Sequence, residues 1–175
     1  HNYLGDKMKK VVICLFLFTI IYEISKNQTE FIIPDNAIRF RVIANSNSFN
    51  DQAMKMEIKN NVETLLQNEL LTSPNLETTK NLLNNNISNI KNMINNYNIS
   101  YDINYGKNYF PEKTYKGVKY EEGIYDSLVI TLGEGNGDNW WCVLFPPLCL
   151  LEENATTNDV EYQFFVSQML DKIFS

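Results

Sequence analysis

Histidine is almost absent from this chain of 175 residues, and its single copy stands at position 1. A Ser-His-Asp triad needs an internal histidine, and the common zinc sites need histidines or a larger set of cysteines. The sequence also contains no G-x-S-x-G or H-E-x-x-H motif. We therefore expect no catalytic set of these kinds, no metal site and no cofactor.

Glycine and proline are also scarce, with 7 and 5 copies, which excludes collagen-like and linker-dominated chains. Hydrophobic residues make up 44% and charged residues 21%, so the chain can bury a core and is not disordered as a whole. The formal net charge is −6 and the sequence pI is about 4.8. A nucleic-acid binder normally has a basic surface, so this acidic balance argues against one.

Basic and apolar residues mark the N-terminal segment. Met8 is followed by two lysines and by an apolar run over residues 11–22, which is too short for a typical membrane span and suits the core of an export signal. No small-x-small cleavage site follows, so residues 8–24 are predicted to be a signal peptide or an uncleaved N-terminal anchor; a buried core helix is the alternative. Residues 1–7 are expected to be an upstream extension, residues 25–34 a linker and residues 35–175 the domain.

Two cysteines of that domain, Cys142 and Cys149, have six residues between them, whereas Cys14 lies in the apolar run. An exported protein meets an oxidising environment in which two such cysteines can pair. The pairing requires the chain to turn back at Pro146-Pro147 so that the Cα atoms approach each other. The alternative is a pair of small buried apolar side chains.

Hydrophobic periodicity predicts three helices and at least four strands. The first helix can be capped by Ser48 or Asn50, the second by Ser73 with Pro74 at its first position, and the last by Asn158. The predicted helices cover 50–71, 73–97 and the residues after 158; the strands cover 38–43, 99–105, 125–132 and 140–145, with a short strand within 114–120. This order predicts a single-domain α+β fold with a mostly antiparallel sheet, two consecutive helices after the first strand and a C-terminal helix.

Glycine recurs at positions 133, 135 and 137. A dinucleotide-binding loop needs a different spacing and a following helix, so we expect a hairpin loop between two strands. Carboxylates near this loop raise one catalytic alternative, a pair of acids acting on a sugar, although a solvated acidic face explains them better. These carboxylates are Glu121, Glu122, Asp126, Glu134 and Asp138.

Two pairs of residues are unusual for their positions. Trp140 and Trp141 are adjacent on a strand, so their side chains should point to opposite faces, and tryptophan is enriched at binding hot spots. Arg39 and Arg41 are the only arginines of the chain and share one side of an apolar strand. They are predicted either to pair with Asp51 or Glu57 or to recognise an acidic group of a partner.

Two longer segments carry a family resemblance. The stretch from Ile38 to Ser48, with Asp51-Gln52-Ala53 and Lys55 behind it, resembles the opening of stage II sporulation protein R of endospore-forming Firmicutes. The second segment, Gly133-Glu-Gly followed by residues 139–149, is similar to that family's second signature. The resemblance covers roughly residues 35–150 and extends to the N-terminal export signal.

The resemblance implies a signal rather than an enzyme. Members of the family are made in the forespore and exported into the space between its two membranes. There they are thought to trigger a membrane-embedded aspartic protease of the mother cell, the sporulation sigma-E factor processing peptidase, which removes the pro-sequence of sigma factor E. This chain departs from the family in lacking a clean cleavage site, so it is expected in that space either released or membrane-anchored.

Under this hypothesis the protein acts by binding its partner protease. The candidate partner-binding residues are Arg39, Arg41, Asn45, Trp140, Trp141, Pro146 and Pro147. Two alternatives stay open, an exported cell-wall hydrolase that uses paired carboxylates and a structural protein of the envelope.

Overall fold

The computed structural model describes residues 9–10, 12–20, 31–33, 36–115, 118–149 and 159–174. The chain divides into two compact units, His1–Glu30 and Phe31–Ser175. In the first unit residues 12–20 are helical, and their apolar side chains, such as Phe16 and Phe18, are exposed. Among the described helices, none has both the length and the apolar character that crossing a bilayer requires.

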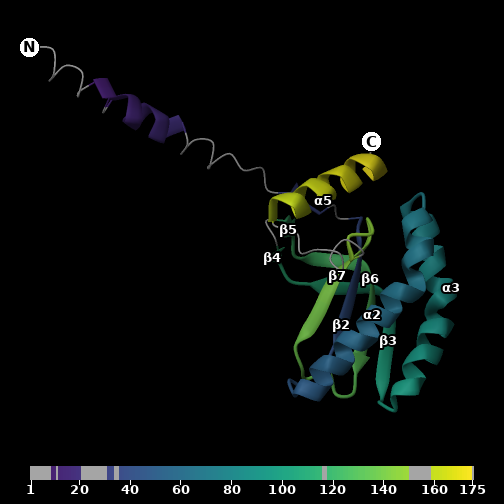
Figure 1. The fold of residues 1–175 in the computed structure, drawn as a ribbon. Helices are drawn as coiled ribbons and strands as arrows, with labels where there is room; N and C mark the ends of the chain where they lie inside the picture. The colour runs from purple at the N-terminus through teal and green to yellow at the C-terminus, as the bar shows by residue number, and fades with distance from the viewer. Residues whose placement is uncertain are drawn as a thin grey trace, which may run out of the picture. The chain divides into compact units, whose positions relative to one another are not determined.

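The second unit is an α+β domain built on a four-stranded sheet (Figure 1). The strand order is β3-β6-β2-β7, in which β2 runs parallel to β6 and antiparallel to β7, and β3 is antiparallel to β6. A smaller sheet has the order β1-β5-β4. The strands are β1 (Phe31–Ile32), β2 (Ile38–Ile43), β3 (Tyr101–Phe110), β4 (Lys113–Tyr115), β5 (Val118–Tyr120), β6 (Gly123–Leu132) and β7 (Asn139–Phe145). The predicted fold class is therefore confirmed.

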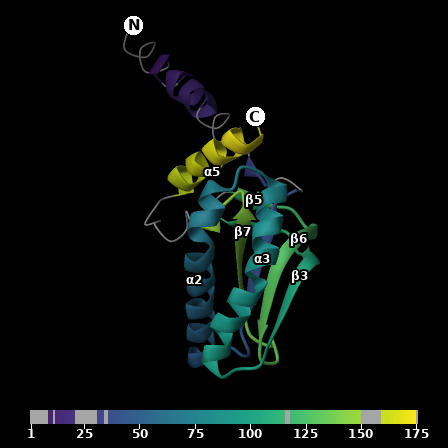
Figure 2. The same cartoon turned by 90° about the vertical axis from the view of Figure 1, so that its right-hand side faces the viewer.

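Two consecutive helices, α2 (Phe49–Thr72) and α3 (Leu76–Ile94), cover one face of the main sheet, as Figure 2 shows. A short 3-10 turn, η1 (Asn95–Tyr97), follows α3. Successive side chains of a strand point to opposite faces of the sheet, and the even-numbered side chains of β2 point toward these helices. The core between helices and sheet includes Ile38, Phe40 and Val42 of β2, Ile58, Val62 and Leu66 of α2, and Leu83, Ile90 and Ile94 of α3.

The opposite face of the sheet carries a second core. Its buried residues are Ile33, Ala37, Val118, Tyr120, Val143, Leu148 and Val166, the last from the C-terminal helix α5 (Asp159–Phe174). Met169 and Leu170 of α5 pack against this cluster. Asn158, the expected cap of α5, lies outside the described residues.

Helix ends agree with the predictions at α2 and differ at α3. The Ser48 hydroxyl accepts a hydrogen bond from the Asp51 amide at 3.1 Å, so Ser48 caps α2. The predicted Ser73 cap of the second helix is wrong, because Ser73 instead ends α2. Asn75 caps α3, and its side chain accepts a hydrogen bond from the Thr78 amide at 2.9 Å. An asparagine oxygen fills this role as well as a serine does.

Three further features of the strands and their connections differ from what the sequence predicts. Strand β3 continues through Gly106 to Phe110, since it pairs with β6 over its whole length. Residues 113–120 form two short strands, β4 and β5, in place of one. The glycine segment is not a hairpin loop, because β2 lies between β6 and β7. Pairing partners in a sheet are chosen by tertiary contacts, and a loop composition does not reveal them.

Charged side chains interrupt the buried face of α2. Lys55, Lys59 and Glu63 follow one another at intervals of one helical turn and are nearly fully buried, whereas the apolar Leu65 is 39% exposed. The Lys59 ammonium lies 2.6 Å from the Glu63 carboxylate, which neutralises both charges. Because the two charges are paired, these charged residues can lie on the buried face of the helix, where a hydrophobic pattern alone predicts apolar residues.

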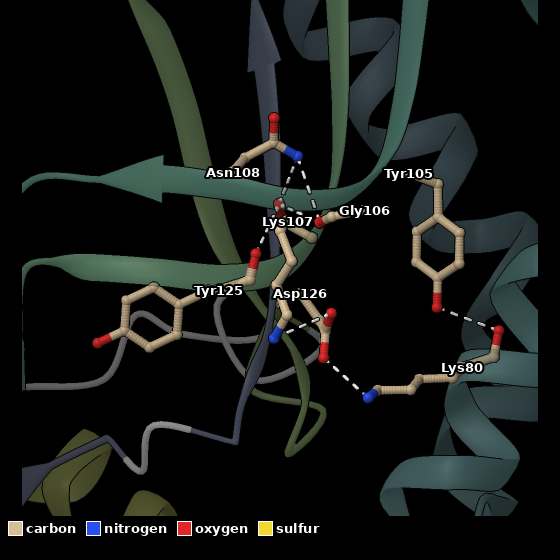
Figure 3. Close-up of polar contacts among 8 residues, drawn as sticks. Lys80, Tyr105, Gly106, Lys107, Asn108, Tyr125 and Asp126 are labelled. Atoms are coloured by element: carbon tan, nitrogen blue, oxygen red, sulfur yellow. Dashed lines mark hydrogen bonds and ion pairs between the residues drawn. The ribbon is translucent and has the colours of Figure 1, made fainter.

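A polar cluster ties α3 to the sheet (Figure 3). The Asp126 carboxylate of β6 lies 2.8 Å from the Lys80 ammonium of α3 and 3.3 Å from the Lys107 ammonium of β3. The Tyr105 hydroxyl donates a hydrogen bond to the Lys80 carbonyl oxygen at 3.1 Å. The hydrogen bond from Lys80 is the largest of the effects that hold the pKa of Asp126 below its usual value.

This lowered pKa predicts a loss of stability in acid. A depressed folded-state pKa means that the unfolded chain binds more protons, so the contribution is present above the ordinary pKa of about 3.9 and is lost as the pH falls toward the folded value. Because the cluster is partly exposed, we expect a contribution of about 1 kcal/mol or less. Urea unfolding between pH 6 and pH 3 would show a weaker pH dependence in Asp126→Asn. Asp102→Asn, a control on the exposed side of β3, should keep the parent profile.

Candidate functional site

Arg39 lies inside the protein, on the face of β2 opposite the two helices. Its side chain is fully buried, and its guanidinium donates a hydrogen bond to the Glu121 carbonyl oxygen at 2.9 Å. Aromatic rings surround the guanidinium carbon, with ring centroids at 3.5 Å (Tyr125), 5.2 Å (Phe110), 5.4 Å (Trp141) and 6.0 Å (Tyr120). Stacking of arginine on aromatic faces stabilises a buried cation.

Arg41 extends the same arrangement toward solvent. This half-buried side chain lies 4.0 Å from the Phe110 ring centroid and donates a hydrogen bond to the Tyr109 carbonyl oxygen at 3.0 Å. Burial lowers the pKa of Arg41 from its ordinary value. The predicted pairs with Asp51 or Glu57 are not formed, because those residues belong to α2, which covers the other face of the sheet.

The two tryptophans of β7 do point to opposite faces. Trp140 makes an edge contact with Phe40, at 5.9 Å between centroids, and the Lys59 ammonium lies 4.5 Å from its ring centroid. Trp141 makes edge contacts with Tyr120 at 5.3 Å and with Phe110 at 5.7 Å, on the arginine side. Both indoles are half-buried. The surroundings of Trp141 therefore hold its ring in one orientation.

A pocket of about 190 Å³ opens beside these indoles. It lies between the start of β7 and the β4-β5 hairpin, and we call it the edge pocket. Its lining residues are Lys113, Tyr115, Tyr120, Asn139, Trp140 and Trp141. The Lys113 ammonium lies 5.1 Å from the Trp141 ring centroid and 5.9 Å from that of Tyr115. The edge pocket is a concave surface that combines aromatic rings, one amide and one cation.

Sequence reasoning named the two tryptophans of the edge pocket and missed its other four residues. Those four lie in two short strands and at a strand start, where no periodicity distinguishes them. The one compositional signal for this part of the pocket was the presence of two tyrosines, Tyr115 and Tyr120, within eight residues of Lys113. Their convergence on β7 depends on how the small sheet packs, which a one-dimensional pattern does not contain.

Asn45 lies at the C-terminal end of β2 and holds the glycine loop that crosses over this strand. Its side-chain oxygen accepts a hydrogen bond from the Glu134 amide at 2.9 Å, and its amide group donates to the Asp51 carboxylate at 3.1 Å. The backbone oxygen of Asn45 accepts a hydrogen bond from the Asn136 amide at 3.0 Å. Hydrogen bonds from Ser46, the largest cause, and from Asn45 lower the pKa of Asp51.

Further polar contacts join the same two segments. The Asn47 side-chain oxygen accepts a hydrogen bond from the Asp138 amide at 2.6 Å, and the Lys55 ammonium donates to the Asp138 carbonyl oxygen at 3.0 Å. A side chain at Gly137 would place its Cβ 2.3 Å from the Ser46 carbonyl oxygen, which explains the glycine there. The two sequence signatures, about ninety residues apart, thus form one polar latch at one end of the sheet.

The latch predicts a measurable role for Asn45. Asn45→Ala should lower the free energy of unfolding by about 1–3 kcal/mol, because it removes the partners of a backbone amide and of a carboxylate. Asn136→Ala, an exposed change in the same loop, should stay within about 0.5 kcal/mol of the parent. Urea unfolding followed by tryptophan fluorescence measures both. Equal stabilities of the two variants would contradict the structural role of Asn45.

Cys142 and Cys149 are joined as a disulfide, with 5.4 Å between their Cα atoms. Both cysteines are buried, and so are Pro146 and Pro147 in the turn between them. The Glu63 carboxylate lies within 4.8 Å of both sulfur atoms. This group does not suit a cation, because the sulfurs are bonded to each other and the Lys59 ammonium already neutralises Glu63.

Several proposed contact residues are therefore unavailable at the surface. Arg39, Pro146 and Pro147 are buried and serve the interior, which corrects their assignment as direct partner contacts. Asn45 is half-buried and engaged in the latch. Arg41 and the two tryptophans keep part of their surface accessible, and the tryptophans line the edge pocket.

The carboxylates of the hydrolase alternative do not gather at one place. Asp126 is near the start of β6 and engages two lysines, whereas Glu134 follows the end of that strand. The six residue steps of β6 from Asp126 to Leu132 alone span roughly 20 Å, at about 3.3 Å per residue, and Glu134 lies beyond them in a turn. Glycosidase carboxylates lie about 5–10 Å apart, so Asp126 and Glu134 do not form such a pair.

Comparisons with known proteins give the family. A family profile described as "Stage II sporulation protein R (spore_II_R)" matches residues 34–155. Stage II sporulation protein R of Bacillus subtilis (strain 168) is 34% identical over 161 residues, which cover 82% of this chain and 72% of that protein. No solved structure matches. The profile spans both segments of the polar latch, and the chain belongs to the stage II sporulation protein R family.

Proposed function

We propose that this sporulation protein is an exported signal that activates, by binding, a membrane-embedded aspartic protease of the mother cell. That protease would be the sporulation sigma-E factor processing peptidase, and its target the pro-sequence of sigma factor E. The family membership supports the sporulation role. The observation that carries the binding mode is the edge pocket, a rigid aromatic recess with a cation at its rim.

Binding explains the described residues better than catalysis does. The pocket holds three kinds of recognition group, namely aromatic rings, an amide and an ammonium, and no carboxylate is among the lining residues that the structure describes. One of its lining residues, Trp141, is contacted by Phe110, Tyr120 and the buried Arg39. Rigid aromatic side chains in a recess are typical anchors of protein interfaces.

Export is supported by the N-terminal pattern and by the disulfide of the domain. A basic start before an apolar run is typical of export signals, and disulfides persist in oxidising compartments. The proposed location is the space between the forespore and mother-cell membranes, with or without a membrane anchor. From there the protein would activate the protease by binding its active state more tightly than its inactive state, and each tenfold preference corresponds to about 1.4 kcal/mol.

Processing of the sigma factor in cells tests this proposal. The cells carry the matching protease and pro-sigma factor and lack their own signal protein; the chain is expressed whole or without residues 8–24. We expect processing with the whole chain alone. A folded, exported chain that produces no processing would contradict the proposal, and processing by the shortened chain would contradict the requirement for export.

A further inference from the structure

The edge pocket opens at the margin of the main sheet and not on one of its faces. Trp140 and Trp141 are neighbours on β7, and their side chains lie on opposite faces of the main sheet. Both nevertheless line the same pocket. Adjacent strand residues can share a recess only where the recess reaches around the edge of the strand. In the described part of the chain β7 ends the order β3-β6-β2-β7 and pairs only with β2. The outward edge of β7 therefore directs alternate backbone N–H and C=O groups away from β2.

The size of the pocket restricts its occupant. A volume of about 190 Å³ is below the range of about 300–1,000 Å³ that is typical of small-molecule sites. It suits one large side chain, presented by a longer ligand that continues past the pocket. An extended peptide can do this, because it adds to a free sheet edge through its main chain and places alternate side chains in pockets.

The chemistry of the rim indicates which side chains such a peptide carries. The Trp141 ring and the Tyr115 ring offer aromatic surface to an apolar or aromatic group. The Lys113 ammonium lies above both rings and is exposed, so it can pair with a carboxylate beside that group. The chain as a whole has a net charge of −6, so this local cation, and not a general attraction, would favour an acidic segment.

We propose that β7 and the edge pocket bind an extended, acidic segment of the partner protein by strand addition. A large apolar or aromatic side chain of the segment fills the pocket, and an adjacent Asp or Glu faces Lys113. This inference rests on the proposed function for the identity of the partner. The recognition chemistry stands on the pocket and the strand edge alone.

A peptide library tests the recognition directly with the full chain. Its members are capped heptapeptides with a threonine–valine frame, which favours extended backbone, and with every residue pair at two central positions. Binding is read from tryptophan fluorescence, since the two tryptophans of the chain both line the pocket. We expect saturable binding that is tightest for an aromatic or large apolar residue next to Asp or Glu. Backbone N-methylation of such a peptide should weaken binding at least tenfold.

Two lysine variants provide the matched comparison. Lys113→Gln should weaken binding of the acidic peptides at least tenfold, whereas Lys91→Gln, an exposed change on α3, should leave it unchanged. Equal affinities of the two variants, or no saturable binding below about 1 mM, would overturn the proposal. It would also be overturned by tighter binding of a soluble muropeptide than of any library member. A dimer in sedimentation that blocks peptide binding would assign the edge to a second copy instead.

Processing in cells separates this inference from the proposed function. Where the parent chain produces sigma factor processing, Lys113→Glu should reduce it at least tenfold and Lys91→Glu should not. Unchanged processing by Lys113→Glu would overturn the pocket assignment and leave the proposed function intact. If the parent chain itself produces none, the proposed function fails, and the peptide titration alone decides the pocket.

Discussion

Arg39→Ala should lower the free energy of unfolding by about 3–5 kcal/mol, the largest effect that we expect from one substitution. The change removes a fully buried guanidinium from the rings of Tyr125, Phe110 and Trp141 and leaves the Glu121 carbonyl oxygen without this donor. The ring contacts are lost in the buried interior, which carries most of the cost, whereas the Glu121 carbonyl oxygen keeps the Tyr125 hydroxyl as a donor at 3.0 Å. Urea unfolding, followed by far-ultraviolet circular dichroism, measures the effect.

Arg41→Ala is the matched control, two residues along the same strand. Arg41 is half-exposed, contacts one ring and donates one hydrogen bond of 3.0 Å, so its loss should cost about 1–1.5 kcal/mol. If the two variants were equally stable, the buried aromatic enclosure would not be a main support of the fold. If the Arg39→Ala chain failed to fold while the Arg41→Ala chain folded, the larger stabilising role of Arg39 would also be supported.

Removal of the disulfide should have the second largest effect. The double variant Cys142→Ala/Cys149→Ala is expected to lose about 2–4 kcal/mol, because the cross-link restricts the unfolded chain and its atoms are buried in the core. The loop it closes is short, which places the entropic part near the lower end of that range. Urea unfolding of the parent with and without dithiothreitol should reproduce the difference.

Alkylation supplies the control for this prediction. The free Cys14 is exposed, so the oxidised chain should react with iodoacetamide at Cys14 alone, as mass spectrometry can show. After unfolding and reduction, Cys142 and Cys149 should react as well. Reaction of both cysteines in the oxidised exported protein would contradict the disulfide, and no change in stability on reduction would contradict its supporting role.

The polar latch gives the two family signatures a physical meaning. The segment after β2 supplies side-chain oxygens at Asn45 and Asn47, and the glycine loop supplies the amides of Glu134 and Asp138. Gly133 and Gly135 adopt positive φ angles of 55° and 66°, so the backbone amides can turn toward these oxygens. Each signature therefore satisfies hydrogen-bonding groups of the other. Together they position the start of β7 and hence the edge pocket.

The sequence alone was sufficient for the properties that depend on local periodicity and composition. It predicted the α+β class, the two consecutive helices, a cap at Ser48 or Asn50, of which Ser48 forms it, and the opposite orientation of Trp140 and Trp141. These features follow from repeats of 3.6 and 2 residues and from the chemistry of single caps. The long motifs also identified the family, because a distinctive string of residues does not depend on how the chain packs.

Only the tertiary structure decided which residues meet. It placed β2 between β6 and β7, enclosed Arg39 in aromatic rings, and brought Lys113, Tyr115 and Tyr120 to the edge of β7. It also paired Lys59 with Glu63 on a helix face where apolar residues were expected. Each of these contacts joins segments or faces whose proximity results from strand pairing and packing, and such long-range choices leave no periodic trace in the sequence.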